Sequence, residues 1–310
     1  MRCLVAGAAG FLGHALALNL VRDGYDVIGV DNLLTGQERH VADLRGLARC
    51  EFRLADVTVP LPDVGHVDWV LHLASPAAPT QYQTLPLETL AANAAGTWRL
   101  LDLARSTSAS FLFASTSEIY GDLRLASMSE STPGLGNPVG PRSAYVEGKR
   151  FGEALTRAYG RRRAVSTRIV RIFNAYGPGM APNDGRVVPE FVTRALRNEP
   201  VVIHGDGEQV RCFTFVDDIV DGIRSVMKNT DPSPINLGNP DGRISVADLA
   251  RLVVRLAGST AAVVHVPGRE DDPRVRIPDT SRARATGWRP AVPLEDGLER
   301  TIAHFRELMT

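Results

Sequence analysis

The 310-residue sequence predicts an α/β fold built on a doubly wound, mostly parallel sheet. Two observations lead to this fold class. Short apolar runs of strand length alternate with longer segments of helical length, and strands that alternate with helices pair in parallel through right-handed crossovers. In addition, the first apolar run, residues 3–6, passes directly into a glycine-rich turn and then into an apolar helix that extends to about Arg22. A Rossmann-type domain begins in this way.

The glycine-rich turn places Gly7, Gly10 and Gly13 at every third position. Glycines at such a turn allow the backbone to approach a pyrophosphate, which then lies at the N-terminus of the following helix. The second expected strand, residues 26–31, ends in Asp31, about twenty residues beyond the glycines, as a dinucleotide site requires. A carboxylate there accepts hydrogen bonds from the adenosine ribose and repels a 2′-phosphate, so the sequence predicts NAD rather than NADP.

The alternation continues through the first half of the chain. We expect further strands at residues 52–56, 69–73, 111–114 and 165–172, with a long helix around residues 90–105 before the central strand. Asp56, at the end of its strand, is placed to contact the adenine amino group. The small residues Ala74 and Ser75 would let a dinucleotide pass closely. His72 lies within an apolar strand and is interpreted as a core residue.

A pair of residues on one helix carries the predicted chemistry. A helix is expected to begin near Ser143 and to contain Tyr145 and Lys149, which are four residues apart and therefore share a face. The hydroxyls of Ser115 and Thr116 end the central strand, and ligands of open α/β sheets bind at such strand ends. A nearby ammonium lowers the pKa of a phenol from its usual value of about 10, so the pair is interpreted as a proton-transfer device.

Beyond Phe173 the sequence predicts a second, smaller lobe of α/β type that is discontinuous in the chain. Residues 180–186 are expected to form a flexible segment over a ligand, and residues 213–228 are expected to return to the sheet. Ser245 and Asp248 have the spacing of a helix start. The predicted domains are residues 1–173 with 213–237, which bind NAD, and residues 174–212 with 238–310, which bind the substrate.

Composition limits the classes of function. Lys plus Arg and Asp plus Glu are each 35, so no net field attracts nucleic acid or an anionic membrane. No membrane span or signal peptide is expected, and three widely separated cysteines predict reduced thiols and a cytoplasmic location. The acidic pairs Asp217-Asp218 and Asp271-Asp272 lack further ligands nearby in sequence, so no metal is predicted.

The motifs resemble those of extended short-chain dehydrogenases/reductases that modify nucleotide sugars. Residues 7–13, the set Ser115, Thr116, Tyr145 and Lys149, and residues 168–178 carry that resemblance. Within the group the chain is most similar to UDP-glucuronate decarboxylases, also called UDP-xylose synthases. The stretches that carry this closer resemblance are residues 30–36, 72–79, 115–122, 137–150, 183–188 and 271–279. Two positions depart from the family pattern: Val146 replaces an acid, and Gly179 replaces an arginine.

The resemblance implies a set of roles. Tyr145 would take the proton of the sugar C4 hydroxyl, Lys149 would hold the nicotinamide ribose, and Thr116 would bond the C4 oxygen. Glu118 and Ser117 would manage water or a proton at C5. The implied catalytic residues are Thr116, Glu118, Tyr145, Lys149 and Arg276. The implied cofactor residues are Gly7, Gly10, Phe11, Leu12, Gly13, Asp31, Asn32, Asp56, Val57, Leu73, Ala74, Ser75, Tyr145 and Lys149. The implied substrate residues are Ser117, Asn174, Val187, Val188, Phe191, Arg211 and Arg276.

Rival functions within the same superfamily stay open at this point. A 4,6-dehydratase usually carries an Asp-Glu pair where this chain has Ser117-Glu118, and a 4-epimerase usually lacks the glutamate. An apiose/xylose synthase shares the decarboxylation. The rival of a different class is a non-catalytic NAD-sensing module, which typically loses the tyrosine or the lysine, whereas this chain keeps both.

The helices around residues 90–105 and 145–159 are apolar on more than one face, which together with the resemblance predicts a homodimer joined by a four-helix bundle.

Overall fold

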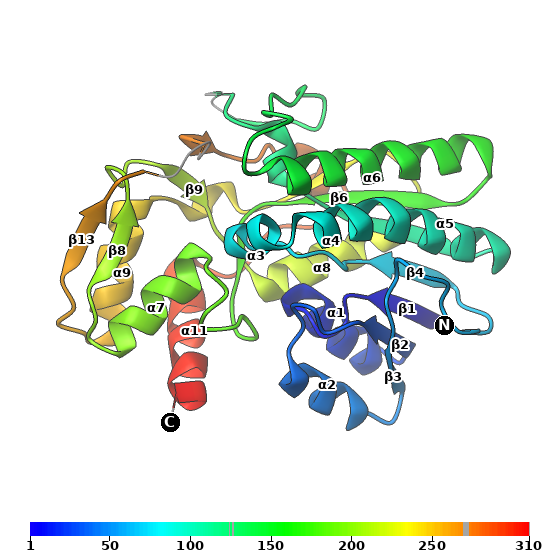
Figure 1. Ribbon diagram of the computed structural model, residues 1–310, viewed down its shortest axis with the longest axis horizontal. Coiled ribbons are helices and arrows are strands. Elements are labelled where there is room, and N and C mark those ends of the chain that lie inside the picture. The colour runs from blue at the N-terminus through cyan, green and yellow to red at the C-terminus, as the bar shows by residue number, and fades with distance from the viewer. Residues whose placement is uncertain (124, 126, 269–272, 310) are drawn as a thin grey trace.

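The computed structural model describes residues 1–123, 125, 127–268 and 273–309. Within them, seven parallel strands form a central sheet in the order β11-β6-β5-β4-β1-β2-β3 (Figure 1). These strands are β1 (Arg2–Ala6), β2 (Asp26–Asp31), β3 (Cys50–Leu54), β4 (Trp69–His72), β5 (Ser110–Thr116), β6 (Thr167–Ile172) and β11 (Ile235–Leu237). The strand order reverses between β1 and β4, and ligands bind at the carboxyl ends of strands beside such a reversal.

Helices cover both faces of this sheet. On one face, α1 (Phe11–Arg22), α2 (Glu38–Arg45) and α8 (Val216–Lys228) bury their apolar residues in the larger core. On the other face, α5 (Thr97–Ser106) and α6 (Ser143–Arg162) pack against the strands (Figure 1). The α/β, doubly wound fold class is therefore confirmed. None of the described helices combines the length and the apolar composition needed to cross a bilayer.

The long helix expected around residues 90–105 is interrupted. Helix α4 (Pro86–Ala91) leads into a π-helical turn (Ala92–Gly96) before α5 begins. Gly96 lies so close to Val57 that an added Cβ would be 2.9 Å from that side chain. His72 is buried beside this turn, with its Nε2 3.2 Å from the Ala92 carbonyl oxygen and 3.1 Å from the Thr97 hydroxyl. The interpretation of His72 as a core residue is confirmed.

The second lobe consists of short sheets packed on helices. Strand β9 (Val210–Cys212) lies between β12 (Arg243–Ser245) and β14 (Val275–Arg276), and β8 (Val201–His204) pairs with β13 (Val263–Val266). Its longer helices are α7 (Val187–Leu196), α9 (Val246–Ala257) and α11 (Leu294–Met309). The shorter helices of the chain are α3 (Pro79–Thr84), α10 (Ser281–Ala285) and the 3₁₀ turns Ser117–Tyr120 and Pro240–Gly242. The Ser245 hydroxyl accepts from the Asp248 amide, as the helix-start signal predicted.

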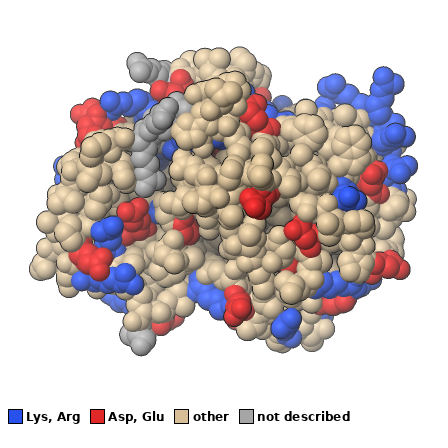
Figure 2. Space-filling model, in the orientation of Figure 1, with Lys and Arg blue, Asp and Glu red and all other residues tan. Residues whose placement is uncertain are grey.

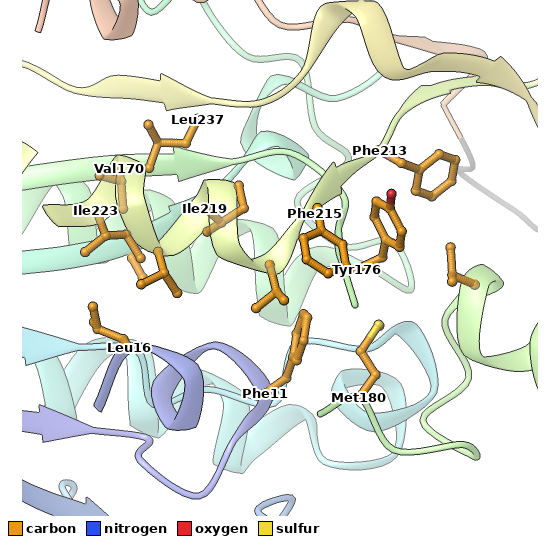
Figure 3. Close-up of a cluster of buried hydrophobic side chains, with 14 of the residues drawn as sticks. Phe11, Leu16, Val170, Tyr176, Met180, Phe213, Phe215, Ile219, Ile223 and Leu237 are labelled. Atoms are coloured by element: carbon orange, nitrogen blue, oxygen red, sulfur yellow. The ribbon is translucent and has the colours of Figure 1, made fainter. Parts of the chain in front are cut away.

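The return to the central sheet differs from the expectation. Strand β10 (Thr214–Phe215) pairs with β7 (Ala175–Tyr176) outside the central sheet, and only β11 rejoins it after α8. The ring of Tyr176 contacts the rings of Phe213 and Phe215, which keeps this pair of strands at the junction of the lobes. Figure 3 shows the buried cluster there, in which Phe11 of α1 and Met180 belong to the same core as Ile219 of α8.

Candidate active site

One pocket lies at the carboxyl ends of the central strands and extends into the second lobe. The predicted site residues that line it are Gly7, Gly10, Phe11, Leu12, Gly13, Leu73, Ser75, Thr116, Ser117, Glu118, Tyr145, Lys149, Asn174, Val187, Val188, Phe191, Arg211 and Arg276. The structure therefore brings the expected catalytic residues together with both groups of expected binding residues. The predicted cofactor residues that do not line this pocket are Asp31, Asn32, Asp56, Val57 and Ala74.

The glycine-rich turn between β1 and α1 has no room for side chains at two positions. Gly7 has a φ of +85°, and a Cβ there would lie 2.7 Å from the Ala74 nitrogen. A Cβ on Gly13 would lie 1.9 Å from the Gly7 carbonyl oxygen. The turn therefore packs tightly under the N-terminus of α1, where backbone N–H groups and the helix dipole favour a phosphate. This geometry fits the pyrophosphate of a dinucleotide.

Asp31 ends β2 beside the same turn. Its carboxylate accepts the backbone N–H groups of Ala9 at 3.0 Å and Leu33 at 2.9 Å. Burial raises the pKa of Asp31, although these N–H groups oppose the shift. Nearby, the Asn32 amide donates to the Asp56 carboxylate at 3.0 Å, so two further predicted cofactor residues contact each other at the ends of neighbouring strands.

Tyr145 and Lys149 lie on the face of α6 that packs on β5, and both are buried. The Lys149 ammonium donates to the Ala114 carbonyl at 2.8 Å and lies 5.7 Å from the centre of the Tyr145 ring. Burial lowers the pKa of Lys149 to about 7, against the opposing charge of Glu153.

Tyr145 differs from the expectation that the ammonium lowers the pKa of the phenol. Burial, reinforced by the negative charge of Glu118, raises the pKa of Tyr145 to about 12, while a hydrogen bond with Thr116 opposes the shift. The physical reason is desolvation, which disfavours the phenolate in a buried site.

Glu118 is the charged centre of the pocket. Its carboxylate lies 3.1 Å from Nη1 of Arg142 and 3.6 Å from Nη1 of Arg276. Burial alone would raise the pKa of Glu118, but the positive charges of Arg142 and Arg276 outweigh burial and hold the pKa below its usual value. The carboxylate is therefore ionised near neutral pH. The Nε of Arg276 is buried without a hydrogen-bond partner among the described residues, which leaves a donor for a ligand.

Sequence reasoning missed Arg142 and Tyr82. The Tyr82 hydroxyl donates to Glu118 at 3.4 Å, and its ring stacks on that of Tyr145 with centroids 4.9 Å apart. Arg142 immediately precedes the helix that the sequence predicted, and Tyr82 lies in α3, far from Glu118 in the chain. No short-range spacing connects these positions, so only tertiary structure reveals their roles.

The segment over the pocket, residues 179–186, is held by several contacts. The Gln37 side chain donates to the Gly179 carbonyl at 2.8 Å, and Arg39 donates to the Met180 carbonyl at 3.0 Å. Arg186 lies over the Phe11 ring, 5.5 Å from its centre, and pairs with Asp184. These contacts connect the segment to α1 and to the start of α2. The flexibility of residues 180–186 stays a prediction.

The pocket wall in the second lobe carries two arginines. Strands β9 and β14 pair in parallel with Arg211 opposite Arg276, so both extend from neighbouring positions of one small sheet. Both side chains are buried. Asn174 has a φ of +30° and donates to the Cys212 carbonyl at 3.1 Å, which links β9 to the end of β6.

Of the two acidic pairs, Asp217-Asp218 lies in the described part of the chain, at the start of α8. The Asp218 carboxylate accepts the backbone N–H groups of Ala291 and Val292. Asp271 and Asp272 lie outside the described residues. Among the described residues there is no group of three or more His, Cys, Asp or Glu side chains that could hold a metal ion.

Comparison with known proteins identifies the family. Residues 3–238 match the NAD-dependent epimerase/dehydratase family. The chain belongs to this family. Its cofactor is NAD, and the resemblance inferred from the motifs is confirmed.

Two curated relatives are similar over nearly the whole chain. UDP-glucuronic acid decarboxylase 1 of Xenopus tropicalis is 44% identical over 307 residues, which cover 99% of this chain and 72% of the relative. UDP-glucuronic acid decarboxylase 1 of Arabidopsis thaliana is 41% identical over 307 residues, which cover 99% and 70%.

Solved structures of the same fold include two epimerases. UDP-glucose 4-epimerase of Thermotoga maritima with UDP-glucose has a TM-score of 0.91 at 29% identity and covers all of both chains. UDP-glucuronic acid 4-epimerase of Bacillus cereus, in complex with UDP-glucuronic acid and NAD, has a TM-score of 0.87 at 27% identity and covers 99% of this chain and 100% of its own.

The glycine-rich turn gives a direct test of cofactor binding. In Gly13→Ala the new methyl group would overlap the Gly7 carbonyl, so the turn must shift away from the pyrophosphate. We expect the affinity for NAD, measured by calorimetric titration, to fall at least about tenfold, or about 1.4 kcal/mol. Gly268→Ala is the control, because a Cβ there makes only ordinary contact at 3.7 Å. Equal affinities of the two variants would contradict the placement of the cofactor.

Proposed function

We propose that this protein converts UDP-glucuronate to UDP-xylose and carbon dioxide, with NAD as its cofactor. The observation that carries the proposal is that two groups of reactive side chains line the same pocket. The Tyr145 and Lys149 pair is suited to oxidising a sugar hydroxyl, and Glu118 lies beside it with two arginines. Relatives named UDP-glucuronic acid decarboxylase support the same reaction.

The first half of the reaction is assigned to α6 and the end of β5. NAD, when bound, supplies a positively charged ring that accepts the hydride from C4 of the sugar and later returns it. A positive charge brought into this pocket lowers the pKa of Tyr145 from its raised value. Tyr145 then takes the proton of the C4 hydroxyl, while Thr116 bonds the same oxygen and Lys149 holds the nicotinamide ribose.

The second half is assigned to Glu118 and its arginines. A ketone at C4 is β to the sugar carboxylate, so carbon dioxide leaves when the bonding electrons pass into an enolate. Two guanidiniums face one ionised carboxylate here, and the remaining positive charge favours binding of the substrate carboxylate. Glu118 holds a water molecule that relays a proton from solvent to C5, and Ser117 assists on the same turn.

The nucleotide is assigned to the second lobe. Arg211 and Arg276 would bind the diphosphate or the carboxylate, since a planar guanidinium matches both. Asn174, Val187, Val188 and Phe191 would line the nucleotide pocket. We propose the corresponding division of the chain, in which residues 1–173 and 213–237 bind NAD while residues 174–212 and 238–310 bind the nucleotide sugar.

We propose a homodimer whose interface is formed by α4, α5 and α6 of each copy. Four large apolar side chains on these helices are exposed: Leu87 (75%), Leu90 (39%), Trp98 (51%) and Phe151 (45%). Figure 2, in the orientation of Figure 1, shows mostly uncharged atoms over the middle of these helices. An isologous interface would cover such a face.

We propose a cytoplasmic location, supported by the cysteines. Cys3, Cys50 and Cys212 are free. Burial raises the pKa of the Cys3 and Cys212 thiols to about 12, so both stay protonated and unreactive.

The function is tested with purified protein, NAD and UDP-glucuronate, by measuring carbon dioxide and identifying the nucleotide sugar by mass spectrometry and chromatography. UDP-xylose is the expected product. UDP-galacturonate would instead identify an epimerase, and UDP-apiose an apiose synthase. A parallel incubation with UDP-glucose tests for a 4,6-dehydratase, which would form a dehydrated product.

Tyr145→Phe should release no carbon dioxide and form no reduced nicotinamide, and Glu118→Gln should be slower by about a hundredfold or more. Tyr25→Phe and Glu147→Gln are the matched controls. Rapid carbon dioxide release by Tyr145→Phe would overturn the mechanism.

The charge on Glu118 makes a pH prediction. Arg142→Met removes a positive charge and a hydrogen bond that lower the pKa of Glu118, so this pKa should rise. Since the ionised form is the active one, the acidic limb of the kcat/KM profile should move to higher pH. Arg142→Lys keeps the charge and should move the limb less. Arg157→Met, which removes a guanidinium bonded to the Pro232 carbonyl, is the control. An unmoved limb in Arg142→Met would exclude the ionisation of Glu118 as its cause.

The dimer proposal predicts twice the monomer mass in light scattering at micromolar concentration. Phe151→Glu places a charge in the apolar face and should lower the mass toward that of a monomer. Leu54→Glu changes a residue of β3 that is 65% exposed and should leave the dimer intact. A monomeric wild-type protein would refute this assembly.

A further inference from the structure

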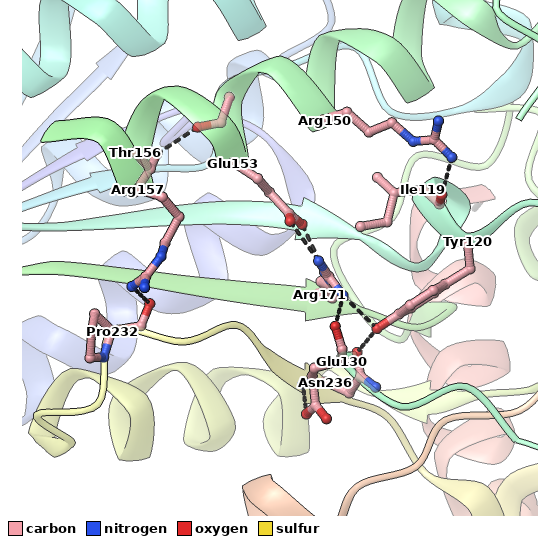
Figure 4. Close-up of polar contacts among 11 residues, drawn as sticks. Ile119, Tyr120, Glu130, Arg150, Glu153, Thr156, Arg157, Arg171, Pro232 and Asn236 are labelled. Atoms are coloured by element: carbon pink, nitrogen blue, oxygen red, sulfur yellow. Dashed lines mark hydrogen bonds and ion pairs between the residues drawn. The ribbon is translucent and has the colours of Figure 1, made fainter. Parts of the chain in front are cut away.

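A buried ion pair connects the helix of Tyr145 and Lys149 to the central sheet. Arg171 of β6 donates from Nε and Nη2 to the two carboxylate oxygens of Glu153, at 2.9 and 2.7 Å (Figure 4). Each residue is 9% exposed. Glu153 lies on α6, four residues beyond Lys149. A buried pair of this kind seldom adds stability compared with apolar residues of the same volume, and one use of such pairs is to specify a unique arrangement.

The remaining guanidinium nitrogen extends the pair into a network. Nη1 of Arg171 donates to the Tyr120 hydroxyl at 2.9 Å and to the Glu130 carbonyl at 2.9 Å. The Tyr120 hydroxyl in turn donates to Oδ1 of Asn236 at 2.7 Å. Tyr120 and Asn236 are both 0% exposed, so water does not compete for these bonds.

Asn236 connects the network to the segment that carries Arg276. Its side-chain amide donates to the Met128 carbonyl at 2.8 Å and to the Asp279 carbonyl at 3.1 Å. Met128 is also bonded to that segment through its backbone, since its N–H donates to the Ile277 carbonyl and its carbonyl accepts from the Asp279 amide. Arg276 immediately precedes Ile277, so the amide of Asn236 fixes the backbone just after Arg276.

The same network fixes the backbone just after Glu118. Tyr120 ends the 3₁₀ turn Ser117–Tyr120, two residues beyond Glu118. The hydroxyl of Tyr120 therefore lies at the centre of a connected set of bonds that joins the turn containing Glu118, the segment that follows Arg276, and α6. These three parts of the site lie far apart in sequence, and Glu118 and Arg276 face each other across the pocket at 3.6 Å.

Tyr145 and Lys149 have anchors of their own. Lys149 is bonded to the Ala114 carbonyl. Gly152 lies against the Phe113 ring so closely that an added Cβ would be 2.3 Å from it. Strand β14, in contrast, spans only Val275–Arg276 and pairs with the short strand β9. Loss of one bond in the network should therefore loosen the Glu118 and Arg276 pair more than the Tyr145 and Lys149 pair.

We propose that Arg171, Tyr120 and Asn236 are positioning residues for the decarboxylation half of the reaction, because their buried network holds Glu118 and Arg276 at a fixed place relative to Tyr145. This inference rests on the proposed function. None of the three residues needs to touch the substrate. Their contribution is geometric, and a displacement of about 1 Å at a reacting centre is enough to cost about a hundredfold in rate.

The test compares two variants that each remove one buried hydroxyl. Tyr120→Phe deletes the hydroxyl between Arg171 and Asn236. Tyr176→Phe deletes a hydroxyl that donates to the Leu294 carbonyl at 3.1 Å, outside the network, from a side chain that is 1% exposed. Both variants and the wild type are mixed with NAD and UDP-glucuronate. Carbon dioxide, the absorbance of reduced nicotinamide on the enzyme, and thermal unfolding are measured.

We expect kcat for carbon dioxide release to fall at least about tenfold in Tyr120→Phe. Reduced nicotinamide should accumulate on this variant, since oxidation continues while the later step is slow. KM should change much less than kcat. Tyr176→Phe should turn over like the wild type, although both variants lose similar thermal stability. Asn236→Asp, which replaces the amide donor by an oxygen facing two carbonyls, should accumulate reduced nicotinamide as well.

Three results would overturn the inference. Turnover of Tyr120→Phe equal to that of Tyr176→Phe would exclude a positioning role. Slow turnover without accumulated reduced nicotinamide would assign the network to oxidation or to stability alone. If the wild type releases no carbon dioxide, the proposed function fails and the inference fails with it, and this outcome is distinguished from the others by the wild-type measurement.

Discussion

Helix α6 lies so close to strand β5 that glycine is required where they touch. A Cβ on Gly152 would lie 2.3 Å from the Phe113 ring, and one on Gly148 would lie 3.1 Å from Cβ of Asn93 in the π-helical turn. This close packing places the first turns of α6 over the carboxyl end of the sheet. Tyr145 and Lys149 therefore face the pocket, and Lys149 reaches a backbone carbonyl of β5. The positions of the other site residues are defined relative to this contact.

Buried charge is the second constraint on the site. Desolvation raises the pKa of Tyr145, which keeps the phenol protonated, and lowers the pKa of Lys149 to about 7, which brings the ammonium close to losing its proton at neutral pH. The pKa of Glu118 is lowered although this residue is buried too, because the positive charges of Arg142 and Arg276 outweigh the effect of burial. One pocket therefore contains a phenol that resists ionisation and a carboxylate that is held ionised.

The two lobes are joined both by an apolar core and by a network of buried hydrogen bonds. Apolar side chains such as Phe11, Tyr176 and Met180 form one continuous core across the junction (Figure 3). The network of Arg171, Tyr120 and Asn236 begins at Glu153 of α6 (Figure 4). The Asn236 amide then donates to the Asp279 carbonyl, in the segment beyond β14. The apolar core stabilises the junction without strong directional preference, whereas the hydrogen bonds specify which atoms lie opposite each other.

Much of the fold was predictable because its signals are local. The glycine spacing at residues 7–13, the alternation of strands with helices, and the four-residue spacing of Tyr145 and Lys149 depend on periodicities that neighbouring residues express. The same reasoning placed Ser245 at a helix start. Long-range contacts changed two local elements. The helix expected around residues 90–105 is present but contains a π-helical turn beside Val57 and His72, and residues 214–215 pair with β7 rather than with the central sheet.

The sequence by itself determined the fold class, the dinucleotide turn and the identity of the pair on α6. Only the tertiary structure placed Arg142 and Tyr82 beside Glu118, and Asn236 beside Tyr120. These contacts join residues separated by 24, 36 and 116 positions, and no periodic pattern encodes such pairings. The raised pKa of Tyr145 has the same origin, since burial depends on how the whole chain surrounds the hydroxyl and not on the residues adjacent to it in sequence.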